Sequence, residues 1–162
     1  MNENVINGQR NNVPVVLATS AIEDLNNQIK IKIYGRAKTL KYLTIIDMFF
    51  LILNLIISVY LKNYFWLFIL FFPLCIFGYY GCKTYNKNYI IPYTCYLFIM
   101  SMYYSVLTFM YGILWFLLLF GLELYFMTYS IKLISYLSEA NEEVLDSLVN
   151  GWTPERLIIY YF

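Results

Sequence analysis

The sequence predicts an all-α integral membrane protein: four transmembrane helices in a bundle, with a short N-terminal segment and a C-terminal amphipathic helix. Of its 162 residues, 61% are hydrophobic and only 13% are charged, whereas a soluble domain is about half apolar and about a quarter charged. The apolar residues also gather in runs of about the 20 residues that a helix needs to cross a bilayer. This composition excludes disordered, collagen-like and coiled-coil chains.

The apolar runs divide the chain into three parts. An N-terminal arm (1–35) precedes the membrane domain (36–137), and an acidic amphipathic tail (138–162) follows it. The predicted crossings are approximately residues 40–61, 64–82, 89–110 and 112–134. The apolar stretch from Tyr89 to Leu137 is too long for one crossing, so we place a turn at Met110–Gly112.

Local patterns in the N-terminal arm predict several short elements. Residues 1–12 are rich in Asn and typical of a disordered arm, and Pro14 favours an extended segment over 13–17. Ser20 and Glu23 have the spacing of a capping box, which predicts the start of a short helix. The strict alternation over 29–34 predicts a strand, or alternatively an interfacial segment with its lysines among the headgroups.

The tail combines acidic residues with apolar residues at helical spacing. We therefore expect the last membrane helix to run on into an amphipathic extension that stops at Asn150–Gly151. Its acids, from Glu139 to Asp146, form a solvated face or a docking face for a basic partner.

The basic residues predict the orientation. Of the eleven lysines and arginines, only Lys62 falls on the side opposite to the two ends. The positive-inside rule therefore places both termini in the cytosol. Aromatic residues are expected in an outer and an inner interfacial belt, the inner one including Tyr42, Tyr80 and Tyr93.

The composition also excludes several classes of function. There is no histidine, which removes the commonest general base and metal ligand. The spacing of the three cysteines matches no zinc pattern, and no phosphate loop or catalytic motif is present. We therefore predict no enzyme activity, cofactor or metal, and a net charge of +1 favours no nucleic-acid partner. The first 30 residues do not resemble a cleaved signal peptide.

Polar residues within the predicted crossings are the candidate functional positions. An acid at the centre of a membrane helix costs about 2.5–3.5 kcal/mol, and Asp47 and Glu123 lie at similar depth. The first crossing carries a polar stripe that should face other helices. Two interpretations stay open: a proton or cation site, or interhelical hydrogen bonding, with pairing of Asp47 to Lys41 or Lys83 as a variant. The intramembrane polar candidates are Asp47, Asn54, Ser58 and Glu123.

Two further features concern packing and modification. Small residues at helical spacing in the third crossing predict a helix-packing face, either within the bundle or between copies of the chain. Its members are Ser101, Ser105, Thr108 and Gly112. Cys82, beside Lys83, is a candidate for palmitoylation, with an inert thiol as the alternative.

Two segments carry a resemblance. Arg36–Leu40 leading to Asp47, together with Phe77–Asn86, is similar to segments of small four-span membrane proteins of large DNA viruses and some protists. The resemblance covers roughly residues 36 to 137 and implies an integral protein of a virion or host internal membrane with no known catalysis. Tetraspanins share the number of crossings, but their large outer loop with its Cys-Cys-Gly motif is absent.

These observations favour a structural or scaffolding membrane protein that anchors soluble partners, such as a coat or capsid layer. The expected partners are the lipid bilayer and a homo-oligomer or a larger assembly. One alternative is a small proton or cation transporter, or an oligomeric channel, that uses Asp47 and Glu123. Another is an accessory subunit of a larger membrane complex.

Overall fold

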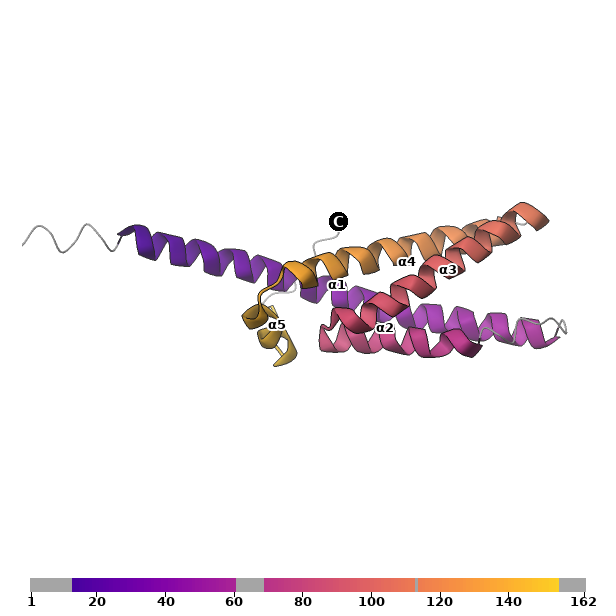
Figure 1. The fold of residues 1–162 in the computed structure, drawn as a ribbon, viewed down its shortest axis with the longest axis horizontal. Helices are drawn as coiled ribbons and strands as arrows, with labels where there is room; N and C mark the ends of the chain where they lie inside the picture. Colours follow the sequence, from indigo (N-terminus) through magenta and orange to yellow (C-terminus); the bar gives the residue numbers. More distant parts are fainter. Residues whose placement is uncertain (1–12, 61–68, 113, 155–162) are drawn as a thin grey trace, which may run out of the picture.

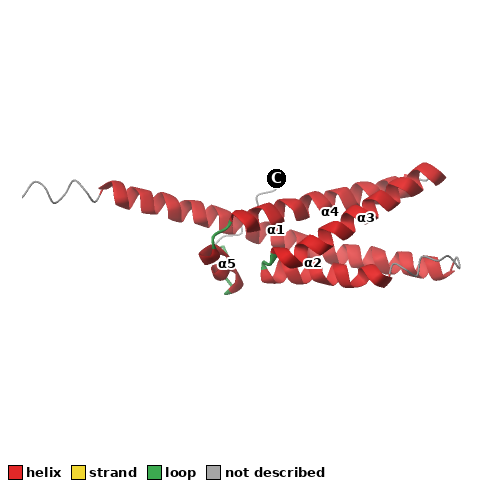
Figure 2. Ribbon diagram, viewed as in Figure 1, coloured by secondary structure: helices red, strands yellow, loops and turns green. Residues whose placement is uncertain are grey.

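The computed structural model describes residues 13–60, 69–112 and 114–154, and no strand occurs among them (Figure 2). These described residues form five α-helices, which Figure 1 labels and colours in sequence order. Their bounds are α1 Val13–Tyr60, α2 Phe72–Thr84, α3 Lys87–Tyr111, α4 Leu114–Glu139 and α5 Glu142–Val149. The all-helical class is therefore confirmed for the described part of the chain.

Three of these helices are long and apolar enough to cross a membrane. They are α1, whose qualifying segment is Glu23–Ile56, α3 and α4. A fourth apolar helical segment, Ile69–Thr84, is shorter, and its first residues form a 3₁₀ turn before α2. The predicted crossing over 64–82 begins among residues 61–68, which lie outside the described part.

The strand predicted over 29–34 is wrong, because these residues belong to α1. An alternation of two also places apolar residues four apart, so Ile29 and Ile33 share one face of a helix. Ile33, Ala37 and Leu40 then continue that face and are all buried. A lone strand would also leave its backbone groups without hydrogen-bond partners.

The start of α1 differs from the sequence expectation as well. The extended segment over 13–17 and the helix start at Ser20 are both wrong, because α1 begins at Val13. Pro14 fits there, since a proline in the first turn of a helix removes no intrahelical hydrogen bond. The disordered arm predicted for residues 1–12 lies outside the described residues.

The turns between the later helices have clear local causes. Between α2 and α3, Tyr85 adopts a left-handed conformation with φ of 52°, and the Asn86 side chain caps α3 by accepting from the Asn88 N–H at 3.0 Å. α3 ends at Tyr111, where Gly112 takes a φ of 64°, which costs a glycine little. This end lies at the turn predicted near Met110–Gly112.

Successive helices from α1 to α4 pack against each other, and α4 and α5 also contact α1. α4 packs most extensively on α3, α2 packs on α1 and α3, and α1 also contacts α4 and α5. Figure 1 shows the first half of α1 extending past the bundle, with α5 tucked beside it. Arg36 joins α1 to α4, with its guanidinium 5.3 Å from the Tyr129 ring centre and 5.2 Å from that of Tyr136.

The tail forms a separate short helix rather than an extension of α4. α4 ends at Glu139, and α5 starts at Glu142 after a break. Val144 and Leu148 of α5 are buried, and the Trp152 ring beyond it meets the Tyr34 ring edge-on at 6.5 Å. α5 and Trp152 are thereby held against the N-terminal half of α1.

Candidate functional site

Asp47 lies at the meeting point of three helices. Its side chain on α1 is 2% exposed. One carboxylate oxygen accepts a hydrogen bond from the Tyr96 hydroxyl of α3 at 3.2 Å, and the other accepts from the Cys75 thiol of α2 at 3.6 Å. The sequence alternatives of pairing with Lys41 or Lys83 are not what the structure shows. Instead, neutral donors from neighbouring helices satisfy the buried acid.

Glu123 brings the fourth helix into the same cluster. Its side chain on α4 is 4% exposed and lies close enough to Asp47 for the two carboxyls to interact electrostatically. Its buried Oε2 has no hydrogen-bond partner among the described residues. The structure therefore brings together the two acids that the sequence places at similar depth.

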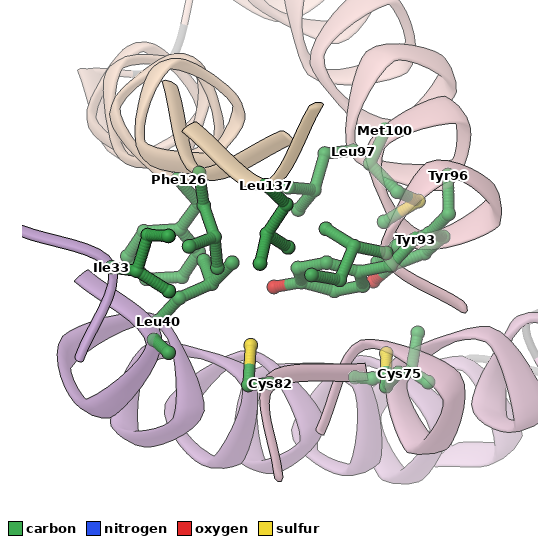
Figure 3. Close-up of a cluster of buried hydrophobic side chains, with 14 of the residues drawn as sticks. Ile33, Leu40, Cys75, Cys82, Tyr93, Tyr96, Leu97, Met100, Phe126 and Leu137 are labelled. Atoms are coloured by element: carbon green, nitrogen blue, oxygen red, sulfur yellow. The ribbon is translucent and has the colours of Figure 1, made fainter. Parts of the chain in front are cut away.

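Tyr93 completes this intramembrane cluster, which comprises Asp47, Cys75, Tyr93, Tyr96 and Glu123. The Tyr93 ring is fully buried, so its expected place in the inner aromatic belt is wrong. Its hydroxyl interacts electrostatically with Asp47 but makes no hydrogen bond of acceptable geometry within the described part of the chain. Figure 3 shows Tyr93 and Tyr96 reaching across toward the side of the bundle that carries Cys75.

Glycine in α2 makes room for this arrangement. A Cβ added to Gly78 would lie 2.5 Å from Cγ of Tyr93, and one added to Gly81 would lie 2.6 Å from the Ile90 side chain. These distances are too short for any real contact, so both glycines let α3 approach α2 closely. Gly78 therefore positions the Tyr93 ring over the cluster.

Other residues of the polar stripe on α1 have separate partners. Thr44 is fully buried and donates to the Lys41 carbonyl at 2.8 Å. The Asn54 amide donates to the Tyr104 hydroxyl of α3 at 2.7 Å. The Ser58 side chain lies outside the described residues.

The predicted packing face on α3 is only partly inside the bundle. Ser101 is 2% exposed, and its hydroxyl donates to the Phe98 carbonyl at 2.8 Å. Ser105 and Thr108 are half-buried, and Gly112 is exposed at the helix end. The four small residues therefore do not form one continuous packing face. Ser101 packs inside the bundle, and Gly112 forms the turn at the end of α3.

Sequence reasoning missed a polar contact between α3 and α4. The hydroxyls of Thr94 and Ser130 lie 2.5 Å apart, and Ser130 is fully buried. Ser130 follows Glu123 by seven residues, so both occupy one face of α4. This spacing could have identified Ser130, whereas the roles of Cys75 and Tyr96 had no such signal.

Cys82 does not suit lipidation in this fold. Its side chain is 3% exposed and forms part of the floor of a hollow between α1 and the end of α2. An acylating enzyme needs access to the thiolate, so burial excludes this thiol as an acceptor in the folded chain. The inert alternative fits the structure.

Within the described ranges, no group of three or more Cys, Asp or Glu side chains is arranged to hold a metal ion. Comparisons with protein-family models, with curated proteins and with solved structures find no match. The function is therefore argued from the geometry of the chain.

Proposed function

We propose that this chain is a four-crossing membrane scaffold that anchors soluble partners to a membrane through its N-terminal arm and acidic tail. The single observation that carries the proposal is the length of α1. At 48 residues and 1.5 Å per residue, α1 is about 72 Å long, more than twice the roughly 30 Å hydrocarbon core. More than half of this helix is therefore available outside the bilayer.

The contact between α1 and α5 supports an even number of crossings. Because α5 packs on α1 beside Asn27 and Lys30 rather than at the far end, we assign both terminal parts to one side of the membrane. α1, α3 and α4 are long and apolar enough for three crossings, and we assign the fourth to the shorter apolar segment Ile69–Thr84. The positive-inside rule, applied to the basic residues of this side, favours the cytosol for both termini.

The filled interior supports a structural role over a transport path. Large side chains from three helices, among them Leu51, Tyr96 and Phe126, are buried between the helices. Within the described residues, one hollow lies between α1 and the end of α2, and another lies between α1 and α5. Neither is lined by Asp47 or Glu123.

A proton or cation site is the second candidate, and the intramembrane cluster favours it. Two carboxylates in one dry site cannot both be charged at low cost, and the unpartnered Glu123 Oε2 offers a place for a proton or cation. An accessory subunit of a larger membrane complex is a third reading, since apolar side chains such as Ile52 and Phe98 are exposed on the bundle. The resemblance to viral and protist four-span proteins would place the scaffold on a virion or host internal membrane.

One pair of measurements separates these functions. A photo-crosslinking residue at Leu25, which is 57% exposed on the arm, should capture a soluble protein, and that protein should leave the membrane fraction when Leu25→Pro breaks the helix. The same probe at Phe109, 91% exposed near the opposite end, should not capture it. Equal capture at both positions would contradict the scaffold.

Proteoliposome flux tests the second candidate. The scaffold predicts no proton or cation flux that depends on Asp47 and Glu123. Flux that disappears in the Asp47→Asn/Glu123→Gln variant and persists in Glu142→Gln/Asp146→Asn would establish transport instead. The control removes two acids that are exposed on α5, so it matches the two carboxyl-to-amide substitutions outside the buried cluster.

A further inference from the structure

The hollow between α1 and the end of α2 gathers positive charge without a matching acid. Its volume is about 230 Å³, several times the roughly 30 Å³ share of a water molecule. Three lysines line it, Lys38 and Lys41 from α1 and Lys83 from α2, and no acidic side chain among the described residues does. Lys38 and Lys41 are three residues apart on one helix face, where like charges repel.

The floor and rim of the hollow suit a phosphate ester. The buried Ala37 and Cys82 close its base. The Lys41 ammonium lies 5.1 Å from the centre of the Tyr79 ring, so a cation–π contact holds it at the rim. Lys38 and Lys83 are exposed, which leaves their ammonium groups free to move onto an anion.

Two tyrosines add to this rim. Tyr34 and Tyr85 both line the hollow, and burial raises the pKa of Tyr85, so its hydroxyl stays protonated. Tyr85 also has the only non-glycine positive φ, 52°, within the described residues. A left-handed residue with a Cβ is strained, and such strain concentrates at functional positions.

The position of the hollow points to the source of the anion. Lys41 and Tyr42 stand at the start of the apolar part of α1, and Tyr42 is 57% exposed. Tyrosine at this depth lies at the level of the lipid headgroups, and basic pockets between membrane helices on the cytosolic side bind anionic headgroups. We propose that the hollow formed by Lys38, Lys41 and Lys83 binds a phosphate group, supplied by an anionic lipid headgroup.

The test uses the full chain in mild detergent and measures its thermal unfolding midpoint and ligand affinity. Dioctanoyl phosphatidic acid should raise the midpoint, whereas dioctanoyl phosphatidylcholine, whose phosphate is neutralised by choline, should not. The Lys38→Gln/Lys83→Gln variant should bind phosphatidic acid about tenfold more weakly or worse, because each charge-assisted contact is lost. High salt should weaken binding to the wild-type chain.

A matched control removes the same charge elsewhere. Lys32→Gln/Lys132→Gln alters two exposed lysines that do not line the hollow, and it should bind phosphatidic acid like the wild-type chain.

A second experiment replaces the lipid with inorganic phosphate. Inorganic phosphate could raise the unfolding midpoint by the same amount as phosphatidic acid, with both increases lost in the Lys38→Gln/Lys83→Gln variant. That result would show that the site takes phosphate from solution and not from a lipid. Equal binding of phosphatidic acid by the two double variants, or equal binding of phosphatidylcholine and phosphatidic acid, would overturn the proposal.

Discussion

At the scale of residues, the interior of the bundle depends on polar groups that satisfy one another. Asp47 is buried at 2% exposure and is held by Tyr96 and Cys75. A buried acid without partners costs several kcal/mol, so these contacts are needed for the helices to pack. Their geometry in turn depends on the close approach of α3 to α2 at Gly78.

Gly78→Ala should therefore destabilise the bundle. The added methyl would overlap the Tyr93 ring, which a Cβ would approach to 2.5 Å, and overpacking of this kind costs about 1–3 kcal/mol. The thermal unfolding midpoint in detergent should fall by a few degrees, at about 2–4 °C per kcal/mol.

The control for this change is Gly121→Ala in α4. Apart from its chain neighbours and the adjacent backbone of α4, no atom of the described chain lies within 4 Å of a Cβ added there, and alanine favours helix over glycine by up to about 1 kcal/mol. Its midpoint should stay or rise. Equal midpoints for the two variants would show that α2 and α3 do not meet closely at Gly78.

At the scale of elements, α1 passes from a polar to an apolar sequence without a break. One buried face, which includes Ile33, Ala37 and Leu40, continues from the arm into the bundle. α5 covers the arm part of this helix with Val144 and Leu148, and the Lys30 ammonium lies 6.0 Å from the Trp152 ring centre. The arm part of α1 therefore packs with α5 and Trp152.

Leu148→Asp should release α5 from α1. Leu148 is 2% exposed, so the variant either buries an unpaired charge or gives up the packing. Hydrogen exchange should show faster exchange of the amides of α5. Val149→Asp, at a neighbouring position that is 58% exposed, should leave exchange unchanged, and loss of protection in both variants would indicate that α5 is not docked through Leu148.

At the scale of the whole molecule, the proposed topology has four crossings with both terminal parts on one side. The contact between α1 and α5 keeps the two terminal parts together, and the turns at Tyr85–Asn86 and Gly112 lie at opposite ends of α3. Helices that cross the membrane in alternating directions are consistent with both the α1–α5 contact and the position of these two turns. The number of membrane crossings depends on whether the short α2 spans the bilayer.

Labelling of inserted tags from each side of the membrane tests this topology. A tag between Lys62 and Asn63 should be accessible only from the side opposite to the termini, whereas tags at Asn88 and Gly151 should be accessible only from the cytosolic side. If the tags at Lys62–Asn63 and Asn88 label from the same side, α2 does not cross the membrane. Labelling of the Lys62–Asn63 tag from the cytosol would reverse the orientation.

Part of the candidate site could be predicted from sequence. Acids are rare in apolar runs, so Asp47 and Glu123 stand out from composition alone, and their spacing from neighbouring polar residues indicates an inward face. The sequence could not predict the partners of Asp47, which are Cys75, Tyr96 and Tyr93. Cysteine and tyrosine occur both in protein cores and at membrane interfaces. Only the way α2 and α3 pack places these three side chains beside Asp47.

The sequence by itself determined the apolar helical character and the turn at Gly112, because these follow from hydrophobic runs and local backbone preference. Of the four crossings that it predicts, three coincide with helices long and apolar enough to span a membrane. Tertiary structure alone decided the state of residues 29–34, whose alternation suits both a strand and one face of a helix. Burial of Ile33 against the bundle resolved that ambiguity in favour of α1. Tertiary structure also decided that Cys82 is buried and that three lysines line one hollow. Contacts between distant segments depend on packing and are not encoded in any local pattern.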